Sequence, residues 1–256
     1  ATANCISKSI EQAKQGRKKA ICFFTGVPGA GKTLAGLNIA NQRLKVAEDE
    51  HAVFLSGNGP LVQVLQEALA RDSVIKNKIK KENALKATKA FIQNIHHFRD
   101  EYLKNSQAPT EKVVVFDEAQ RAWNQHQTRK FMIQKRGRPD FNQSEPEFLI
   151  EVMNRHQDWC VIVCLIGGGQ EINTGEAGLV AWMQALQASY PDWQMHYSNL
   201  IVNQDNYLKD AAIKNWVCKT GVEQKHLHLA TSVRSFRSEK VSAWVHALLD
   251  MDEQAK

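Results

Sequence analysis

The stretch TGVPGAGKT, Thr25–Thr33, decides the fold class of this 256-residue chain. It has the spacing Gly-x-x-x-x-Gly-Lys-Thr of a P-loop, in which glycines let backbone N–H groups approach phosphate oxygens closely. The apolar run KKAICFFTG before it predicts a buried strand, and TLAGLNIANQRL after it has the apolar spacing of a helix. We therefore expect a strand, a phosphate-binding loop and a helix, rather than a plain strand-to-helix turn.

This loop predicts a site for ATP and Mg²⁺. The Lys32 ammonium is expected at the β- and γ-phosphates, and the Thr33 hydroxyl is expected to ligate Mg²⁺. The positive end of the dipole of the following helix is expected to face the phosphates. The residues predicted to surround the cofactor are Gly26, Val27, Pro28, Gly29, Ala30, Gly31, Lys32, Thr33 and Leu34.

A second motif, KVVVFDEAQ, places Asp117 and Glu118 directly after an apolar run. This is the Walker B arrangement. Asp117 is predicted to hold Mg²⁺, usually through water, and Glu118 to orient or deprotonate the attacking water. Alone, such a pair is typical of a solvated strand end. Downstream of a P-loop, the catalytic interpretation is favoured.

Two further segments follow apolar runs. LIGGGQEIN places Gln170 after three glycines, where its amide is expected to contact the γ-phosphate or the attacking water; a flexible turn is the alternative. HLATSVRSFR places Arg234 where its charge can neutralise the γ-phosphoryl group; a surface arginine is the alternative. The predicted catalytic residues are Lys32, Glu118, Gln170 and Arg234, and the predicted metal-binding residues are Thr33 and Asp117.

The chain alternates strand-like apolar runs with helical patterns. The runs are AICFF, AVFLS, KVVVF, CVIVCLI and HLHLA, and the helical patterns cover Thr33–Leu44, Leu61–Arg71, Glu145–His156 and Gly178–Ser189. This alternation predicts an α/β fold, a mainly parallel sheet with helices on both faces and a ligand site beyond the carboxyl ends of the strands. Two stretches are expected to be exposed basic insertions, Lys76–Lys89 and Thr128–Ser144, the second with little periodicity.

Composition and charge indicate which partners and which cellular compartment to expect. The net charge of +6 and the pI near 9.0 favour an acidic partner, with nucleic acid as the first candidate. The five cysteines lack the spacing of a disulfide framework or a zinc site and indicate reduced thiols in a cytoplasmic protein. No signal peptide is recognised, and the longest apolar run, WCVIVCLI, is too short to span a bilayer. The stretch KRGRP, 135–139, is similar to the core of an AT-hook, although a solvated basic loop is favoured.

The P-loop, DEAQ, GGGQ and SVRS together resemble the motifs of superfamily-one DNA/RNA helicases. The strings LSGNGPLVQVLQEAL, IQNIHHFRDEY, DEAQRAW, SEPEFLIEVMNRHQDW and GGGQEINTGEAGL resemble the bacterial Schlafen-related family of helicase-domain ATPases, over about Cys22 to Leu249. The resemblance implies a first RecA-like domain over residues 1–230. It also implies that Arg234 contacts the γ-phosphate, that the loop 56–58 touches the backbone of a single strand of DNA or RNA, and that His96 or His97 stacks on a base.

Helicases of this superfamily use a second RecA-like domain that closes the nucleotide cleft. Residues 231–256 are expected to begin such a domain or to form a C-terminal helix, with a further domain or protein partner completing the ATP site. The function expected is ATP hydrolysis coupled to nucleic-acid binding, as part of a helicase or translocase motor. The alternative is a nucleotide-gated switch or signalling ATPase that acts on a protein partner. A phosphotransferase is disfavoured, because Asp117, Glu118 and Gln170 suit water as the acceptor.

Overall fold

The strands form one parallel sheet. The computed structural model describes residues 2–43, 50–167 and 176–232. Its sheet has the order β3-β2-β4-β5-β1-β6-β7, with β8 beside the end of β1, and every pair is parallel. The strands are β1 (Lys19–Gly26), β2 (His51–Ser56), β3 (Ile92–Asn94), β4 (Glu111–Asp117), β5 (Cys160–Gly167), β6 (Gln194–Tyr197), β7 (Val222–Glu223) and β8 (His228–Leu229).

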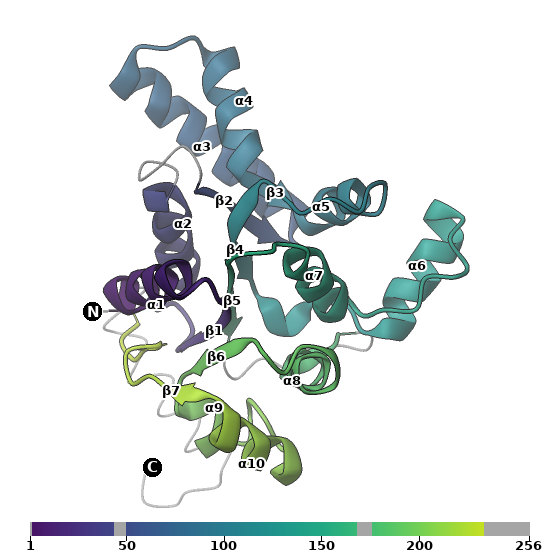
Figure 1. The fold of residues 1–256 in the computed structure, drawn as a ribbon. Coiled ribbons are helices and arrows are strands. Elements are labelled where there is room, and N and C mark those ends of the chain that lie inside the picture. The colour runs from purple at the N-terminus through teal and green to yellow at the C-terminus, as the bar shows by residue number, and fades with distance from the viewer. Residues whose placement is uncertain (1, 44–49, 168–175, 233–256) are drawn as a thin grey trace, which may run out of the picture.

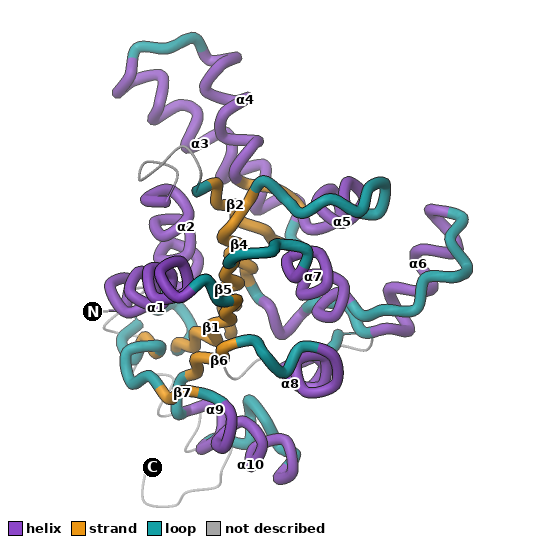
Figure 2. Tube along the Cα trace, in the orientation of Figure 1, coloured by secondary structure: helices purple, strands orange, loops and turns teal. Residues whose placement is uncertain are grey.

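Helices lie on both sides of this sheet, which Figure 2 shows as a central column of strands. They are α1 (Thr2–Gly16), α2 (Lys32–Arg43), α3 (Gly59–Asn77), α4 (Lys81–Phe91), α5 (Ile95–Tyr102), α6 (Gln125–Arg136), α7 (Glu145–Asn154), α8 (Gly178–Ser189), α9 (Leu200–Asn203) and α10 (Ala211–Thr220), with a 3₁₀ turn η1 (Ala119–Arg121). In Figure 1, α1 and α2 lie on one side of the strands, and α5, α7 and α8 lie on the other.

Two apolar cores fill the spaces between the sheet and these helices. Successive side chains of β1 alternate between them: Ile21 and Phe23 pack with residues of α5, α7 and α8, whereas Cys22 and Phe24 pack with residues of α1 and α2. Burial on both faces explains why the central strands read as continuous apolar runs. The predicted parallel α/β architecture with helices on both faces is confirmed.

The strand ends line up at one edge of the sheet. Gly26 of β1 is paired in register with Gly167 of β5, and Ser56 of β2 is paired with Asp117 of β4. β5 lies between β1 and β4. The parallel register therefore carries the glycine loop, the Asp-Glu pair and the loop after β2 to the same edge.

The predicted helical segments are all present, with shifted ends. α2 is shifted by one residue at each end, α7 begins as predicted and ends two residues early, and α8 agrees at both ends. α3 begins at Gly59 and runs past the predicted Arg71 to Asn77. Several elements were not predicted, namely α1, α4, α5, α6, α9, α10, β3, β6 and β7. α1 buries only a few apolar residues in a polar segment, and the three strands are short, so each carries a weak sequence signal.

The first half of the predicted basic insertion Thr128–Ser144 belongs to α6, although its sequence shows little periodicity. The Asn124 side chain caps this helix by accepting from the Gln127 backbone N–H, and Met132 is fully buried. This cap and the buried Met132 side chain stabilise the helix, although the surrounding sequence is polar.

The KRGRP stretch spans the end of this helix and the exposed loop that follows it. Lys135 and Arg136 close α6, and Gly137 follows in the left-handed conformation, with φ of 63°. Arg136 pairs with Asp100, and Arg138 lies 3.6 Å from the Asp140 carboxylate.

All five cysteines are free, and Cys22, Cys160 and Cys164 are buried, as expected. Burial raises the pKa of Cys22 and Cys160 to about 12, so their thiols stay protonated. Among the helices that the structure describes, none has the length and apolar character needed to cross a bilayer.

α2 packs very closely on the sheet at Gly36. A Cβ atom added there would lie 2.5 Å from Leu165 Cδ1, 3.0 Å from Val115 Cγ1 and 3.3 Å from the Phe54 ring. This close approach fixes the helix that begins at the glycine loop directly over β2, β4 and β5.

Replacing Gly36 with valine should therefore overpack this contact and lower the free energy of unfolding by about 1–3 kcal/mol. Urea unfolding followed by circular dichroism measures the change. Gly57→Ala is the matched control, because no atom lies within 4 Å of an added Cβ at Gly57. Equal stability of the Gly36→Val variant and the unsubstituted chain would contradict this account of the packing.

Candidate functional site

The loop between β1 and α2 has the backbone geometry of a phosphate-binding loop. Gly29 and Gly31 have φ values of 76° and 84°, which side-chain-bearing residues rarely adopt. The Lys32 ammonium folds back over the loop and donates to the carbonyl oxygens of Gly26 at 2.9 Å and Val27 at 3.3 Å. The lysine is thus held over the concave side of the loop, at the N-terminus of α2, where an anion is favoured.

The predicted metal-binding residues lie side by side. The Thr33 hydroxyl donates to the Asp117 carboxylate, with both carboxylate oxygens at 3.2 Å. Asp117 is almost completely buried. Its pKa is raised to about 6, mainly because burial disfavours the charged form and secondly because the Glu118 carboxylate is close. A hydroxyl beside a carboxylate is a donor set that suits Mg²⁺, and a cation there would favour the ionised form.

Glu118 follows Asp117 in an unusual backbone conformation, with φ of 51° and ψ of 47°. For a glutamate this left-handed conformation is costly and needs support from its surroundings. The Gln120 side chain supplies part of it, because its amide nitrogen donates to the Glu118 carboxylate and its amide oxygen accepts from the Gly167 backbone N–H at 3.1 Å. Gln120 therefore ties the predicted catalytic carboxylate to the end of β5.

One cavity of about 750 Å³ joins these groups to the loop after β2. Its wall contains the predicted metal-binding and catalytic residues Thr33, Asp117 and Glu118. It also contains Ser56, Gly57 and Asn58, the residues predicted to contact nucleic acid. The Asn58 side chain caps α3 by accepting from the Leu61 backbone N–H at 3.1 Å. The predicted metal-binding and catalytic carboxylates and the loop predicted to contact nucleic acid thus line one cavity.

A buried polar cluster forms a further wall of this cavity. Glu145 accepts from Arg99 at 3.0 Å and from the Trp123 backbone N–H at 2.9 Å, so it connects α5, α7 and the segment after η1. Burial raises the pKa of Glu145 and lowers the pKa of Arg99, and each is stabilised in its charged form by the other. The sequence placed Glu145 only at the start of the predicted helix Glu145–His156, and its structural role had no local signal.

The structure distinguishes the two histidines of IHHF. His96 packs against the Trp123 and Phe131 rings, at centroid distances of 4.6 and 5.6 Å, and burial lowers its pKa to about 4. His97 is exposed. His96 therefore belongs to the aromatic support of the cavity wall, and His97 is the one that faces solvent.

Two predicted catalytic residues, Gln170 and Arg234, lie outside the described residues. The described part of the chain stops at Gly167 before Gln170 and at Ser232 before Arg234. β8 nevertheless runs beside the phosphate loop: the Val27 backbone N–H donates to the Leu229 carbonyl oxygen at 3.0 Å. Residues 231–256 fall almost entirely in the undescribed part, so the predicted domain boundary stays a prediction.

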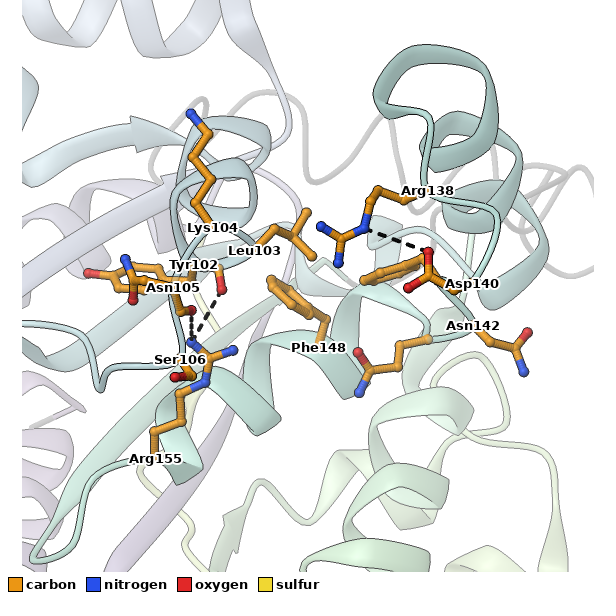
Figure 3. A pocket seen from close by; sticks show the side chains of 12 residues that line it. Tyr102, Leu103, Lys104, Asn105, Ser106, Arg138, Asp140, Asn142, Phe148 and Arg155 are labelled. Carbon is orange, nitrogen blue, oxygen red and sulfur yellow. Dashed lines mark hydrogen bonds and ion pairs between the residues drawn. The ribbon is translucent and has the colours of Figure 1, made fainter.

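A second cavity, of about 580 Å³, is drawn in Figure 3. Tyr102 precedes β4 and Arg155 precedes β5, so this cavity lies near the amino ends of these strands, away from the glycine loop. Arg155 donates to the carbonyl oxygens of Tyr102 and Asn105, at 3.2 and 2.9 Å, and pairs with Glu151. Its charge is already compensated, and we assign no ligand to this cavity.

Within residues 2–43, 50–167 and 176–232, no group of three or more histidine, cysteine, aspartate or glutamate side chains is arranged to hold a metal ion. Cation binding at Thr33 and Asp117 would therefore need phosphate oxygens or water to complete the coordination.

The parallel sheet with helices on both faces defines an α/β domain, and the glycine loop and the acidic pair follow its strands at one edge. Residues 19–256 match the family described as Schlafen group 3, DNA/RNA helicase domain, and the chain belongs to this family. The predicted relation to Schlafen helicase domains is confirmed, and its bacterial and superfamily-one parts stay predictions.

Among solved structures, the chain is similar to the helicase domain of Hef from Pyrococcus furiosus, with a TM-score of 0.41 and 16% identity over 77% of this chain. The similarity covers 39% of the Hef chain. No curated protein matches the sequence.

The buried Asp117 carboxylate leads to a pH-dependent prediction. Between the ordinary aspartate pKa of 3.8 and about 6, the folded protein binds this proton more strongly than the unfolded chain does. The free energy of unfolding therefore falls as the pH rises through this window. Asp117→Asn should then stabilise the protein by about 1–3 kcal/mol at pH 8 in EDTA, with a smaller gain at pH 5. Urea unfolding at both pH values measures this.

Asp192→Asn, at an exposed position, is the control and should change stability by less than about 0.5 kcal/mol. A loss of stability in the Asp117→Asn variant at pH 8 would contradict the raised pKa.

Proposed function

We propose that this domain binds ATP with Mg²⁺, hydrolyses it and couples hydrolysis to its grip on a single strand of DNA or RNA. The observation that carries the proposal is the shared cavity, whose wall contains both Asp117 and Glu118 and the loop 56–58. The two carboxylates and the loop 56–58 line the same cavity, so a change at the carboxylates would be felt by the loop that the family resemblance assigns to nucleic-acid contact.

The residues of the site fit the nucleotide and the metal. Bound ATP with Mg²⁺ would supply the γ-phosphoryl group to be transferred to water and a cation that neutralises its charge. Lys32, Thr33 and the backbone N–H groups of the glycine loop would hold the β- and γ-phosphates and the metal. The Lys32 ammonium would exchange the Gly26 and Val27 carbonyl oxygens, which it contacts now, for phosphate oxygens.

Glu118 would take the proton of the attacking water. Its carboxylate is oriented by the Gln120 amide, so the proton acceptor is held in one position before the reaction begins. Gln120 also holds Gly167, the last residue of β5, and the predicted sensor Gln170 follows three residues later. Gln170 and Arg234 keep the roles of γ-phosphate contacts as part of the proposal, with a further domain or protein partner holding Arg234 over the cleft.

The loop 56–58 and His97 would contact the single strand of DNA or RNA. An added Cβ at Gly57 would meet nothing within 4 Å, so a phosphate can approach the backbone there. His97 is exposed and offers a flat ring for a base. We also propose a cytoplasmic location, which the five free thiols support.

Two substitutions test the nucleotide chemistry. Lys32→Ala should lower ATP turnover by at least about 10²-fold, because the phosphates lose their principal cation. Glu118→Gln should lower turnover by about 10²- to 10⁴-fold and keep ATP binding, because the amide accepts the Gln120 hydrogen bond and takes no proton. Turnover and binding of a fluorescent ATP analogue measure the two effects, with Lys225→Ala at an exposed position as the control. Unchanged turnover in either site variant would overturn the assigned roles.

Stimulation by nucleic acid tests the coupling. Turnover should rise when single-stranded DNA or RNA is added, and binding of the strand should weaken steeply with salt because phosphate contacts release counterions. Absence of both effects at about 50 mM salt would reject the motor proposal in favour of a nucleotide-gated switch with a protein partner.

A further inference from the structure

α3 and α4 form a helical hairpin, residues 59–91, that projects from the sheet (Figure 1). α3 has 19 residues and is about 28 Å long, so the connection to α4 lies far from the cores. We call residues 75–81 the tip of the hairpin. At the tip, Lys78 ends α3 in the left-handed conformation, with its backbone N–H donating to the Val74 carbonyl oxygen.

The hairpin carries most of the excess positive charge of the protein. Residues 59–91 contain seven lysines and arginines and three acidic residues, a net charge of +4, against +6 for the whole chain. Arg71, Lys76 and Lys81 pair with Glu67 or Asp72. Four exposed lysines make no ion pair with any described residue: Lys78, Lys80, Lys86 and Lys89. Unneutralised lysines on a projecting element suit a polyanion.

The tip also exposes two large apolar side chains. Ile75 is 78% exposed and Ile79 is 38% exposed, and lysines flank both. Aliphatic side chains of this kind, combined with basic residues, pack against or between base pairs in architectural DNA-binding proteins. The same combination is poorly suited to a single strand, because strand-binding surfaces stack bases on aromatic rings. Residues 59–90 contain no phenylalanine, tyrosine, tryptophan or histidine.

The base of the hairpin lies next to the loop 56–58 and His97, the proposed binding site for single-stranded DNA or RNA. A cavity of about 620 Å³ lies between α3 and α4, and its wall contains Gly59, Lys89, Asn94 and His97. Gly59 directly follows the loop 56–58, and Lys89 faces the same cavity from α4. Basic and polar groups therefore continue from the proposed strand site toward the lysines of the tip.

We propose that the tip of the α3–α4 hairpin binds the duplex at the point where a duplex meets the single strand held by the domain. Lys78 and Lys80 contact phosphates of the duplex, and Ile75 and Ile79 pack against the terminal base pair, whose outer face is apolar and already unstacked. This inference rests on the proposed function, because it requires the adjoining strand to be held at the loop 56–58 and His97.

Fluorescence anisotropy with three labelled probes tests the inference: a single strand, a blunt duplex, and the same duplex with that strand as a tail. The unsubstituted chain should bind the tailed duplex at least about tenfold more tightly than the single strand. Lys78→Glu combined with Lys80→Glu should remove this difference and reduce the slope of log affinity against log salt by about 1.8, the value for two phosphate contacts. Ile75→Ser should weaken tailed-duplex binding by about tenfold.

Matched controls separate a local contact from a general change in charge or apolar surface. Lys219→Glu combined with Lys225→Glu makes the same change of charge at exposed positions at and after the end of α10, and Figure 1 shows this helix at the opposite end of the molecule from the hairpin. Ile133→Ser makes the same substitution at another exposed isoleucine, on α6. Both controls should bind the tailed duplex as the unsubstituted chain does, and circular dichroism should show that every variant is folded.

The outcomes distinguish this inference from the proposed function. Stimulation of ATP turnover by a single strand, measured on the unsubstituted chain, tests the proposed function alone. If the strand stimulates turnover but the tailed duplex binds no more tightly than the strand, the tip proposal is overturned and the motor proposal stands. The tip proposal is also overturned if the tip variants bind the tailed duplex normally, or if the controls weaken binding equally. If no probe binds, both proposals fail.

Discussion

The common direction of the strands is the constraint on which the rest of this structure depends. Because every paired strand is parallel, each chain segment leaves the sheet at the same edge and must return by a helix or a long connection. Gly26, Asp117 and Gly167 come from separate parts of the sequence and meet at that edge through backbone register alone. Side chains then refine an arrangement that backbone hydrogen bonding has already made, as the contact of Thr33 with Asp117 shows.

Buried charge is the cost of this arrangement. Asp117 lies in a poorly hydrated position beside Glu118, with a raised pKa and one hydroxyl donor. Glu145, in the wall of the same cavity, pairs with Arg99, and each stabilises the charged form of the other without any role in the proposed chemistry. The first group is left under-compensated where a cation is expected, and the second is compensated internally. This difference separates a binding site from a structural ion pair more clearly than burial does.

The sequence predicted the fold because its central strands and the helix after the P-loop have strong signals: unbroken apolar runs, regular apolar spacing and glycines at fixed positions. It predicted poorly where stability comes from contacts far apart in sequence. α6 is held by Met132 in the core and by Phe131 against His96 and Trp123. The polar, basic sequence of this segment does not predict these contacts. Likewise, Gln120 belonged to a recognised motif, but only the structure gives its partners, Glu118 and Gly167.

The bridge made by Gln120 has a practical consequence. The Gly167 N–H donates to the Gln120 amide oxygen while the other end of the same side chain holds Glu118. Exchange of that one amide proton with solvent requires the bridge to open. Its exchange rate is therefore a readout of how firmly the carboxylate is held, from a backbone atom that takes no part in binding or chemistry. Hydrogen–deuterium exchange at Gly167 would follow the order of the site through each nucleotide state without any substitution in the site.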